Sequence, residues 1–174
     1  VGICWQEIIK RSKPVGLALS RQNLPVLDRN KYASAQGAAN GAYVLAYGSA
    51  DSKDKCEVIL IATGSEIHLA IAAREKLAEE GIKARVVSAP CLEWFMEQPD
   101  SYRNQVLPKT IKARVSIEAG VAQPWYQYIG DSGVPISVES FGASASASVL
   151  FKEFGFTVEN VVSAAIESIR NANG

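Results

Sequence analysis

The sequence predicts an α/β protein, a three-layer α/β/α arrangement around a mostly parallel, five-stranded sheet whose first strand is antiparallel. Short apolar runs alternate with helical patterns along most of the chain, which is typical of a sheet with helices on both faces. The first two strands are joined by a polar loop, residues 48–55, that has no room for a helix. We therefore expect the first strand to be antiparallel to its neighbour.

Five apolar runs are expected to form the sheet. They span residues 43–47, 58–62, 84–89, 113–118 and 135–138. The second run, Val58-Ile59-Leu60-Ile61-Ala62, is apolar at every position. An uninterrupted apolar run indicates a strand that is covered on both faces rather than one.

The helices follow from apolar residues at three- and four-residue spacing. The clearest helix runs from Ser65 to Gly81, where the glycine ends it. A broken helix around Pro99 and a short helix with three aromatic residues come next, and two helices close the chain, the last capped by Thr157. The expected ranges are 91–107, 124–129, 144–154 and 157–172.

The first 40 residues have a different pattern. Residues 3–12 are expected to form the end of a helix that Pro14 stops, and Val15-Gly16-Leu17-Ala18-Leu19 has the apolar pattern of a buried strand. Residues 22–40 show no clear periodicity and are interpreted as a linker.

Composition excludes several classes of function. Lysine plus arginine and aspartate plus glutamate both number 18, so no basic surface for nucleic acid or an anionic membrane is expected, and no apolar run could span a bilayer. Cys4, Cys56 and Cys91 are widely spaced, and with a single histidine they do not predict a zinc site. We interpret them as free thiols in a reducing, cytoplasmic compartment.

Arg21 is the residue best suited to contact a ligand. It follows the apolar run at residues 15–19, at what would be the carboxyl end of a strand, where open α/β sheets place ligand contacts. A guanidinium there can hold a phosphate or carboxylate through a pair of charge-assisted hydrogen bonds. The alternative is a structural role, on the surface or paired with Asp28 or Glu7.

The other candidates do not form a catalytic set. At Thr63-Gly64-Ser65-Glu66 a helix N-terminus could bind an anion, but Glu66 would repel it, and a structural cap is favoured. His68 has no G-x-S-x-G serine to pair with, and the serines within residues 144–148 mark a helix start. The aromatic residues at 125, 126 and 128 are more typical of a core or an interface than of a stacking site.

Several motifs resemble those of transketolases. Leu19-Ser20-Arg21-Gln22-Asn23-Leu24-Pro25 is similar to the segment that closes their pyrimidine-binding domain. The remaining motifs are similar to the C-terminal domain, in family order: Gly41-Ala42-Tyr43-Val44-Leu45, Ile61-Ala62-Thr63-Gly64-Ser65-Glu66, Lys83-Ala84-Arg85-Val86-Val87-Ser88, Tyr102-Arg103 with Val106-Leu107-Pro108, Ser116-Ile117-Glu118-Ala119-Gly120, Phe141-Gly142-Ala143-Ser144 and Phe154-Gly155-Phe156-Thr157. Each motif alone is weak, but their number, order and spacing make the match specific.

The resemblance implies a domain organisation and an activity. Residues 1–27 would end the pyrimidine-binding domain, residues 28–40 would be a linker, and residues 41–174 would form the C-terminal domain. The family is implied to be a cytoplasmic homodimer of the pentose phosphate pathway that transfers a two-carbon ketol unit from a ketose phosphate to an aldose phosphate. Its cofactors are thiamine diphosphate and Mg²⁺ (or Ca²⁺), and its Ser-Arg-Gln arginine contacts the substrate phosphate, which gives Arg21 that role.

The resemblance also implies that the reaction centre precedes Val1. The sequence does not begin with Met, so we expect a piece of a longer protein. Gly130-Asp131-Ser132-Gly133, with Asn160, only loosely matches the family's metal motif because its second glycine is displaced, and we interpret it as a turn. The chain itself is expected to contain no catalytic, cofactor-binding or metal-binding residue, to be inactive alone, and to support its own N-terminal domains and the dimer.

Two other interpretations are considered. A stand-alone domain could bind a nucleotide at the Thr63–Ser65 turn or serve in assembly, but the helix and strand expected in residues 1–20 need partners to bury their apolar faces. The chain could also be the tail of another thiamine diphosphate enzyme, a 2-oxo acid dehydrogenase or a deoxyxylulose phosphate synthase. The Ser20-Arg21-Gln22-Asn23-Leu24-Pro25 segment favours a transketolase over both.

Overall fold

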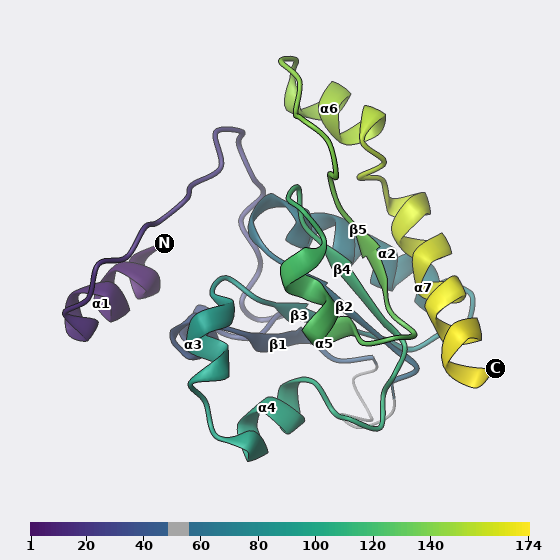
Figure 1. Ribbon diagram of the computed structural model, residues 1–174, viewed down its shortest axis with the longest axis horizontal. Helices are drawn as coiled ribbons and strands as arrows, with labels where there is room; N and C mark the ends of the chain where they lie inside the picture. Colours follow the sequence, from purple (N-terminus) through teal and green to yellow (C-terminus); the bar gives the residue numbers. More distant parts are fainter. Residues whose placement is uncertain (49–55) are drawn as a thin grey trace.

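The computed structural model describes residues 1–48 and 56–174 and contains one five-stranded sheet (Figure 1). The strands are β1 (Tyr43–Ala46), β2 (Val58–Ala62), β3 (Ala84–Ser88), β4 (Arg114–Ile117) and β5 (Val134–Ile136). Their order is β1-β3-β2-β4-β5, with β1 antiparallel to β3 and the other pairs parallel. The predicted α/β fold is confirmed. Of the polar loop predicted at 48–55, residues 49–55 lie outside the described residues.

The helices are close to their predicted positions, except η1 (Ala35–Asn40), which lies in the predicted linker. They are α1 (Gly2–Arg11), η1 (Ala35–Asn40), η2 (Gly64–Glu66), α2 (Ile67–Glu79), α3 (Leu92–Met96), α4 (Asp100–Val106), η3 (Gln123–Trp125), α5 (Tyr126–Ile129), α6 (Ala147–Glu153) and α7 (Val158–Asn173). The break predicted around Pro99 separates α3 from α4. In the part of the chain that the structure describes, no helix has both the length and the apolar character that a bilayer crossing requires.

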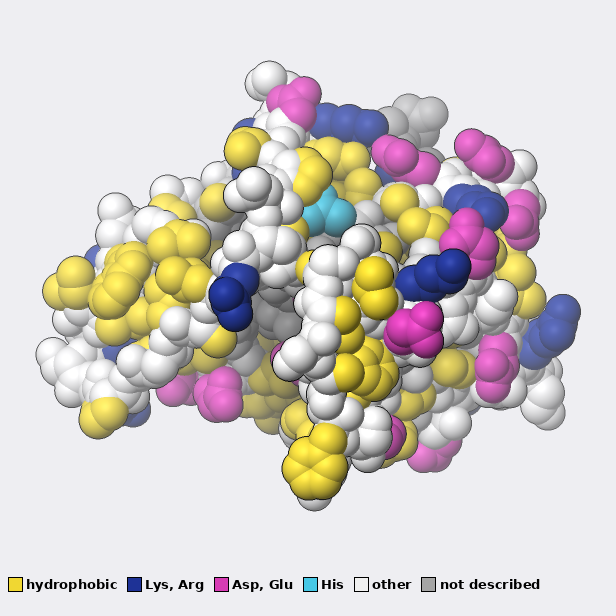
Figure 2. Space-filling view, turned by 90° about the horizontal axis from the view of Figure 1, so that it is seen from above, with side chains coloured by type: hydrophobic (Ala, Val, Ile, Leu, Met, Phe, Trp, Pro, Cys, Tyr) yellow, Lys and Arg dark blue, Asp and Glu magenta, His cyan; other side chains and the backbone are white. Residues whose placement is uncertain are grey.

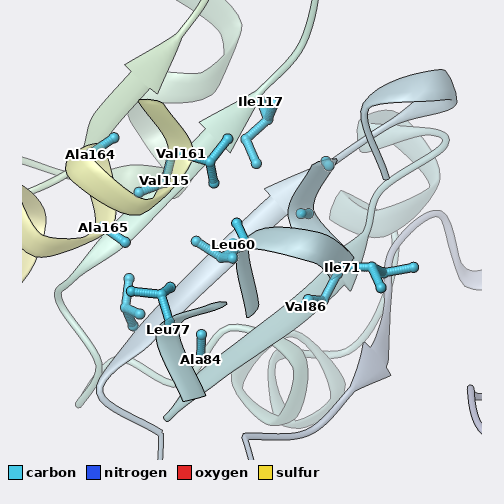
Figure 3. Close-up of a cluster of buried hydrophobic side chains, with 14 of the residues drawn as sticks. Leu60, Ile71, Leu77, Ala84, Val86, Val115, Ile117, Val161, Ala164 and Ala165 are labelled. Carbon is cyan, nitrogen blue, oxygen red and sulfur yellow. The ribbon is translucent and has the colours of Figure 1, made fainter. Parts of the chain in front are cut away.

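The sheet is buried on both faces because its central strand is apolar throughout. Alternate side chains of β2 point to opposite faces, so Val58, Leu60 and Ala62 join one core cluster and Ile59 and Ile61 the other. Helices α2 and α7 cover the first face, where Leu60 lies between side chains of both helices (Figure 3). Helices α3, α4 and α5 cover the second face with aromatic and aliphatic side chains. This arrangement is the predicted three-layer architecture.

Local signals fix the ends of the two long helices. The Thr157 hydroxyl accepts a hydrogen bond from the Asn160 N–H (3.2 Å) and caps α7, as predicted. Gly81, with φ of 81°, follows α2, and the N–H of Ile82 then donates back to the carbonyl of Leu77 (2.9 Å). That left-handed conformation strains any residue other than glycine.

Two arginines, on the strands β3 and β4 that flank β2, bind the carbonyls at the C-terminal end of α4. Arg85 Nη1 donates to the carbonyls of Gln105 and Val106, both at 3.0 Å. Arg114 Nη2 donates to the carbonyl of Pro108 at 2.8 Å, just beyond the helix. Cations are favourable at this end of a helix dipole, so the two guanidinium groups hold α4 against the sheet.

Two predicted elements are wrong in whole or in part. Val15–Leu19 is extended but pairs with no strand of the described residues, and the side chains of Val15 and Leu19 are exposed. A strand needs a partner for its N–H and C=O groups, and none lies beside this segment in the described part of the chain. The helix predicted from Ser144 begins at Ala147, because Ser144 lies in an exposed extended segment. The predicted linker at residues 28–40 contains a turn at Asp28–Tyr32 and η1.

The packing of α2 on the sheet predicts the cost of a core truncation. We expect Leu77→Ala to lower the free energy of unfolding by about 2–5 kcal/mol, because Leu77 is fully buried and the truncation removes transfer energy and leaves a cavity. Leu19→Ala makes the same chemical change at an exposed position and should cost less than about 0.5 kcal/mol. Urea unfolding followed by circular dichroism measures both. Equal losses in the two variants would contradict the assigned core.

Candidate functional site

The parallel strands end together at one edge of the sheet, which makes this carboxyl edge the first place to look for a site. Chain order reverses at β2, since β3 lies on one side of it and β4 on the other. Ligands of open α/β sheets bind in the crevice at such a reversal. Here the crevice is bordered by the Thr63–Glu66 turn after β2 and by Glu118–Gly120 after β4.

A cavity of about 330 Å³ lies at this edge. Its floor comes from the strand ends and from two tryptophans, and its outer wall comes from the N-terminal segment. The cavity is lined by Thr63, Glu93, Trp94, Glu118 and Trp125 on the sheet side and by Cys4, Ile8 and Leu17 on the N-terminal side, among others. The sequence did not predict Trp94 or Glu118 as site residues. The position of Glu118, directly after the apolar residues of a strand, could have indicated a residue at the carboxyl edge of the sheet.

Glu66 fills the position that an anion would take at the start of α2. Its side chain is only 6% exposed, and its carboxylate accepts hydrogen bonds from its own N–H, from the N–H of Ala119 and from the Ser65 hydroxyl (3.1 Å). Burial raises the pKa of Glu66 above its ordinary value, the nearby Glu118 carboxylate adds to the rise, and the hydrogen bonds partly offset it. The structural role predicted for this turn therefore fits its geometry.

Carboxylates dominate the rest of the crevice. Glu118 Oε2 accepts a hydrogen bond from Trp125 Nε1 (2.6 Å), and Glu93 Oε2 lies 3.4 Å from the Cys91 thiol. Among the described residues, no lysine or arginine lines the cavity. A phosphate or diphosphate would meet like charge here without a cation to compensate it, so the crevice is unsuited to phosphorylated ligands.

Arg21 lies elsewhere, on the exposed segment between α1 and η1. It forms no ion pair with a described residue. Both acids considered as its partners are engaged otherwise: Glu7 pairs with Lys10 (2.8 Å), and Asp28 accepts from the N–H of Asn30 (2.9 Å). Arg21 is exposed, and its guanidinium carries five N–H donors that a phosphate could reach.

The residues of the loose metal motif do not converge. Ser132 Oγ donates to the carbonyl of Asn171 (3.4 Å), near the end of α7, whereas Asn160 in the first turn of α7 donates to the carbonyl of Gly155 (2.9 Å). Asn171 lies eleven positions after Asn160 on the same helix, about 16 Å along the helix axis. The 130–133 segment is a turn, closed by a hydrogen bond from the Gly133 N–H to the Gly130 carbonyl (3.2 Å).

The remaining candidates take structural positions. Trp125 and Tyr128 are buried with ring centroids 6.2 Å apart, while Tyr126 is exposed. His68 is half-buried in the first turn of α2, and burial lowers its pKa. The serines within residues 144–148 are exposed before and at the start of α6. The cysteines are free thiols, one buried (Cys56) and two half-buried, as predicted.

No metal centre is formed by the described residues. They contain no group of three or more histidine, cysteine, aspartate or glutamate side chains placed to hold an ion. Together with the acidic crevice, this donor set does not fit a metal-bound diphosphate.

Comparisons with known proteins agree on one family. A model described as the transketolase-like TK C-terminal domain matches residues 41–157. The transketolase of Mycobacterium tuberculosis is 52% identical over 171 residues, which are 96% of this chain and 24% of that protein. Transketolase 1 of Escherichia coli is 48% identical over 166 residues, covering 95% of this chain and 24% of its own length. The chain thus spans about a quarter of the relatives it matches.

Solved structures give the same result for the fold. A transketolase from Pichia stipitis, determined in complex with sedoheptulose-7-phosphate, superposes with a TM-score of 0.77 at 36% identity. The superposition covers 88% of this chain and 21% of that structure. A transketolase from Leishmania mexicana superposes with a TM-score of 0.68 at 40% identity, over 78% of this chain and 19% of that one.

The environment of Glu66 predicts a pH effect on stability. Because its pKa is raised in the folded state, the unfolded chain loses the Glu66 proton first as the pH rises above about 4.3, and stability falls until the raised pKa is passed. A glutamine side chain cannot ionise, so the free energy of unfolding of Glu66→Gln should rise relative to wild type as the pH rises above about 4.3. Chemical unfolding at a series of pH values measures the difference. Glu153→Gln, on the exposed face of α6, is the control, and a parallel trend in both variants would contradict the assignment.

Proposed function

Because this chain belongs to the transketolase family, we propose that it forms the C-terminal part of a cytoplasmic, homodimeric transketolase. The whole enzyme would transfer a two-carbon ketol unit from a ketose phosphate to an aldose phosphate within the pentose phosphate pathway. The observation that carries this proposal is near-50% identity to proteins named transketolase over 96% of the chain. Sedoheptulose-7-phosphate, the ligand of the Pichia stipitis enzyme, supports a sugar phosphate as the substrate class.

The proposed domain organisation places residues 1–27 at the end of the pyrimidine-binding domain, residues 28–40 in a linker and residues 41–174 in the C-terminal domain. The surface of the N-terminal segment supports this division. Hydrophobic side chains gather over the α1 end of the molecule (Figure 2). The exposed large hydrophobic residues of residues 1–27 are Val1, Trp5, Ile9, Val15, Leu19, Leu24 and Val26. So much exposed apolar surface is expected where other domains of the same protein pack.

The cofactors would be held outside this chain. Thiamine diphosphate with Mg²⁺ (or Ca²⁺) requires a metal-ligand set and positive or N–H groups for its diphosphate. The described residues form no such metal-ligand group and place no lysine or arginine in the lining of the cavity at the carboxyl edge. The chain matches only 24% of the length of its relatives, which leaves most of each relative to carry the reaction centre. We propose that this chain is inactive alone and serves as scaffold and dimer support.

Arg21 is the one residue proposed to touch the substrate. Its exposed guanidinium has no ion-pair partner among the described residues, and it lies in the Ser-Arg-Gln segment that resembles the family's phosphate contact. A bidentate guanidinium–phosphate contact is geometrically well matched and charge-assisted. The acidic crevice at the carboxyl edge offers no competing phosphate site.

The alternative of a stand-alone nucleotide-binding domain is less well supported. Its site would be the Thr63–Ser65 turn, and there the Glu66 carboxylate already accepts the N–H and hydroxyl hydrogen bonds that a phosphate would need. A nucleotide would have to displace a buried carboxylate and then bind beside Glu118. Both steps cost free energy.

The proposal predicts the effect of removing the Arg21 guanidinium from the longer enzyme that contains this sequence. Arg21→Ala should cost roughly 2–5 kcal/mol of transition-state binding with phosphorylated donors, because a charge-assisted contact is lost. Ketol transfer from an unphosphorylated donor should be unchanged. Steady-state kinetics with a matched pair of donors measures both.

Either of two results would count against this assignment. If Arg21→Ala transfers from phosphorylated donors as well as wild type does, Arg21 has a structural role. If the wild-type enzyme transfers no ketol unit, the proposed activity itself is wrong.

The proposal also predicts the behaviour of the 174-residue chain with the cofactor. Titration calorimetry with thiamine diphosphate and Mg²⁺ should give no saturable heat, because the described residues form no site for a metal-bound diphosphate. Binding in the micromolar range, about −8 kcal/mol, would contradict the assignment of the cofactor site to other domains.

A further inference from the structure

Helix α1 is tied to the C-terminal domain by the side chain of its last residue, Arg11. The guanidinium forms an ion pair with Glu97, and its carbon atom Cζ lies 4.3 Å from the centroid of the Trp94 ring. A guanidinium can stack on an aromatic face and bind a carboxylate at the same time, because it is planar and presents donors along its edges. We call this three-residue contact, Arg11 with Trp94 and Glu97, the α1 clasp.

The receiving half of the α1 clasp belongs to α3 and the residue that follows it. Trp94 is buried in α3, and its carbonyl accepts a hydrogen bond from Gln98 Nε2 (3.0 Å). Glu97 is the first residue after α3. Phe95, which follows Trp94 in α3, is only 2% exposed and packs in the core. Arg11 lowers the pKa of Glu97 through the hydrogen bond between them, so this carboxylate stays ionised well below neutral pH. The surface that α1 meets is thus already formed on the C-terminal domain.

The rest of α1 contributes little burial to this contact. None of its residues is buried, and Trp5 and Ile9 are 51% and 74% exposed. The cavity between the helix and the carboxyl edge, lined by Cys4 and Ile8 of α1, leaves the interface loosely filled. Hydrophobic packing on the described residues is therefore weak. Helix α1 also lies against η1, and the Arg11 contacts are its polar and stacking tie to α3 and the residue that follows it.

The α1 clasp also sets the path of the chain that leads to Arg21. After Arg11 the chain turns at Ser12, the only non-glycine residue with positive φ among the described residues. Pro14 then restricts the backbone because its ring fixes φ. Residues 15–17 then cross the carboxyl edge as part of the cavity wall. Arg21 follows four residues beyond this crossing, so a displaced α1 would displace the segment that carries it.

From this geometry we propose that Arg11 is a positioning residue for Arg21, through which the C-terminal domain fixes the phosphate-binding arginine. This inference rests on the proposed phosphate role of Arg21. It gives the C-terminal domain a part in substrate binding although none of its residues is proposed to contact substrate.

The first experiment tests the α1 clasp on the 174-residue chain without any substrate. Cys4 lines the cavity beneath α1, so its reaction rate with a small maleimide, mapped by mass spectrometry, reports how firmly the helix is held. We expect Arg11→Ala to raise the Cys4 rate at least about fivefold relative to wild type. Lys10→Ala is the matched control, because Lys10 pairs with Glu7 of the same helix. Equal rates for Arg11→Ala and Lys10→Ala would overturn the α1 clasp.

The second experiment tests positioning in the longer enzyme. Arg11→Ala should raise the KM for a phosphorylated donor roughly tenfold, with a smaller change in kcat and none for an unphosphorylated donor. Arg11→Lys keeps the charge but loses the planar stack, and should fall between wild type and Arg11→Ala. In Arg21→Ala enzyme the Arg11→Ala effect should disappear, because the group being positioned is absent.

The outcomes separate this inference from the function on which it rests. An equal loss with phosphorylated and unphosphorylated donors, or an Arg11→Ala effect that persists without Arg21, would overturn the positioning role and leave the transketolase activity intact. A wild-type enzyme without ketol transfer would overturn the activity and the positioning role together, while the Cys4 rates would still decide whether the α1 clasp exists.

Discussion

The burial of β2 on both faces is the constraint on which the rest of the structure depends. Its five side chains are at most 1% exposed, and it pairs with β3 on one edge and β4 on the other. A strand of this kind requires a helical layer on each face, so α2 and α7 cover one side and α3, α4 and α5 the other. Polar turns can then leave the core only at the ends of the strands. The charge and polarity of the carboxyl edge are therefore determined by the turns that follow the strands there.

That edge is where an open α/β sheet usually binds its ligand, yet its chemistry here is unsuited to a phosphate. Glu66 satisfies the start of α2 from within the chain, and Glu118 is bonded to the buried Trp125 indole. The residue proposed to bind the substrate phosphate, Arg21, lies outside the sheet. In the proposed enzyme, a domain with the architecture of a ligand-binding fold would have a structural role: the sheet would support the segment, and the segment would contact the substrate.

The sequence was informative wherever a local pattern matched its tertiary surroundings. The uninterrupted apolar run at 58–62 predicted a doubly covered strand, and Thr157 and Gly81 predicted helix ends, because caps and glycine conformations are local effects. The prediction of a buried strand at Val15–Leu19 was wrong because an apolar run indicates burial but does not supply a strand to pair with. The site was harder to predict: Trp94 and Glu97 are 83 and 86 residues from Arg11, and no spacing rule connects contacts that the fold alone brings together.

The central claim is that the substrate phosphate is bound by the Arg21 segment and that the sheet only supports it. A crystal structure of the longer enzyme with a bound ketose phosphate tests this most directly. The account predicts Arg21 guanidinium nitrogens within about 2.7–3.2 Å of the phosphate oxygens and no phosphate contact from residues 41–174. A phosphate bound at the Thr63–Glu66 turn, or an Arg21 side chain directed away from the substrate, would contradict it.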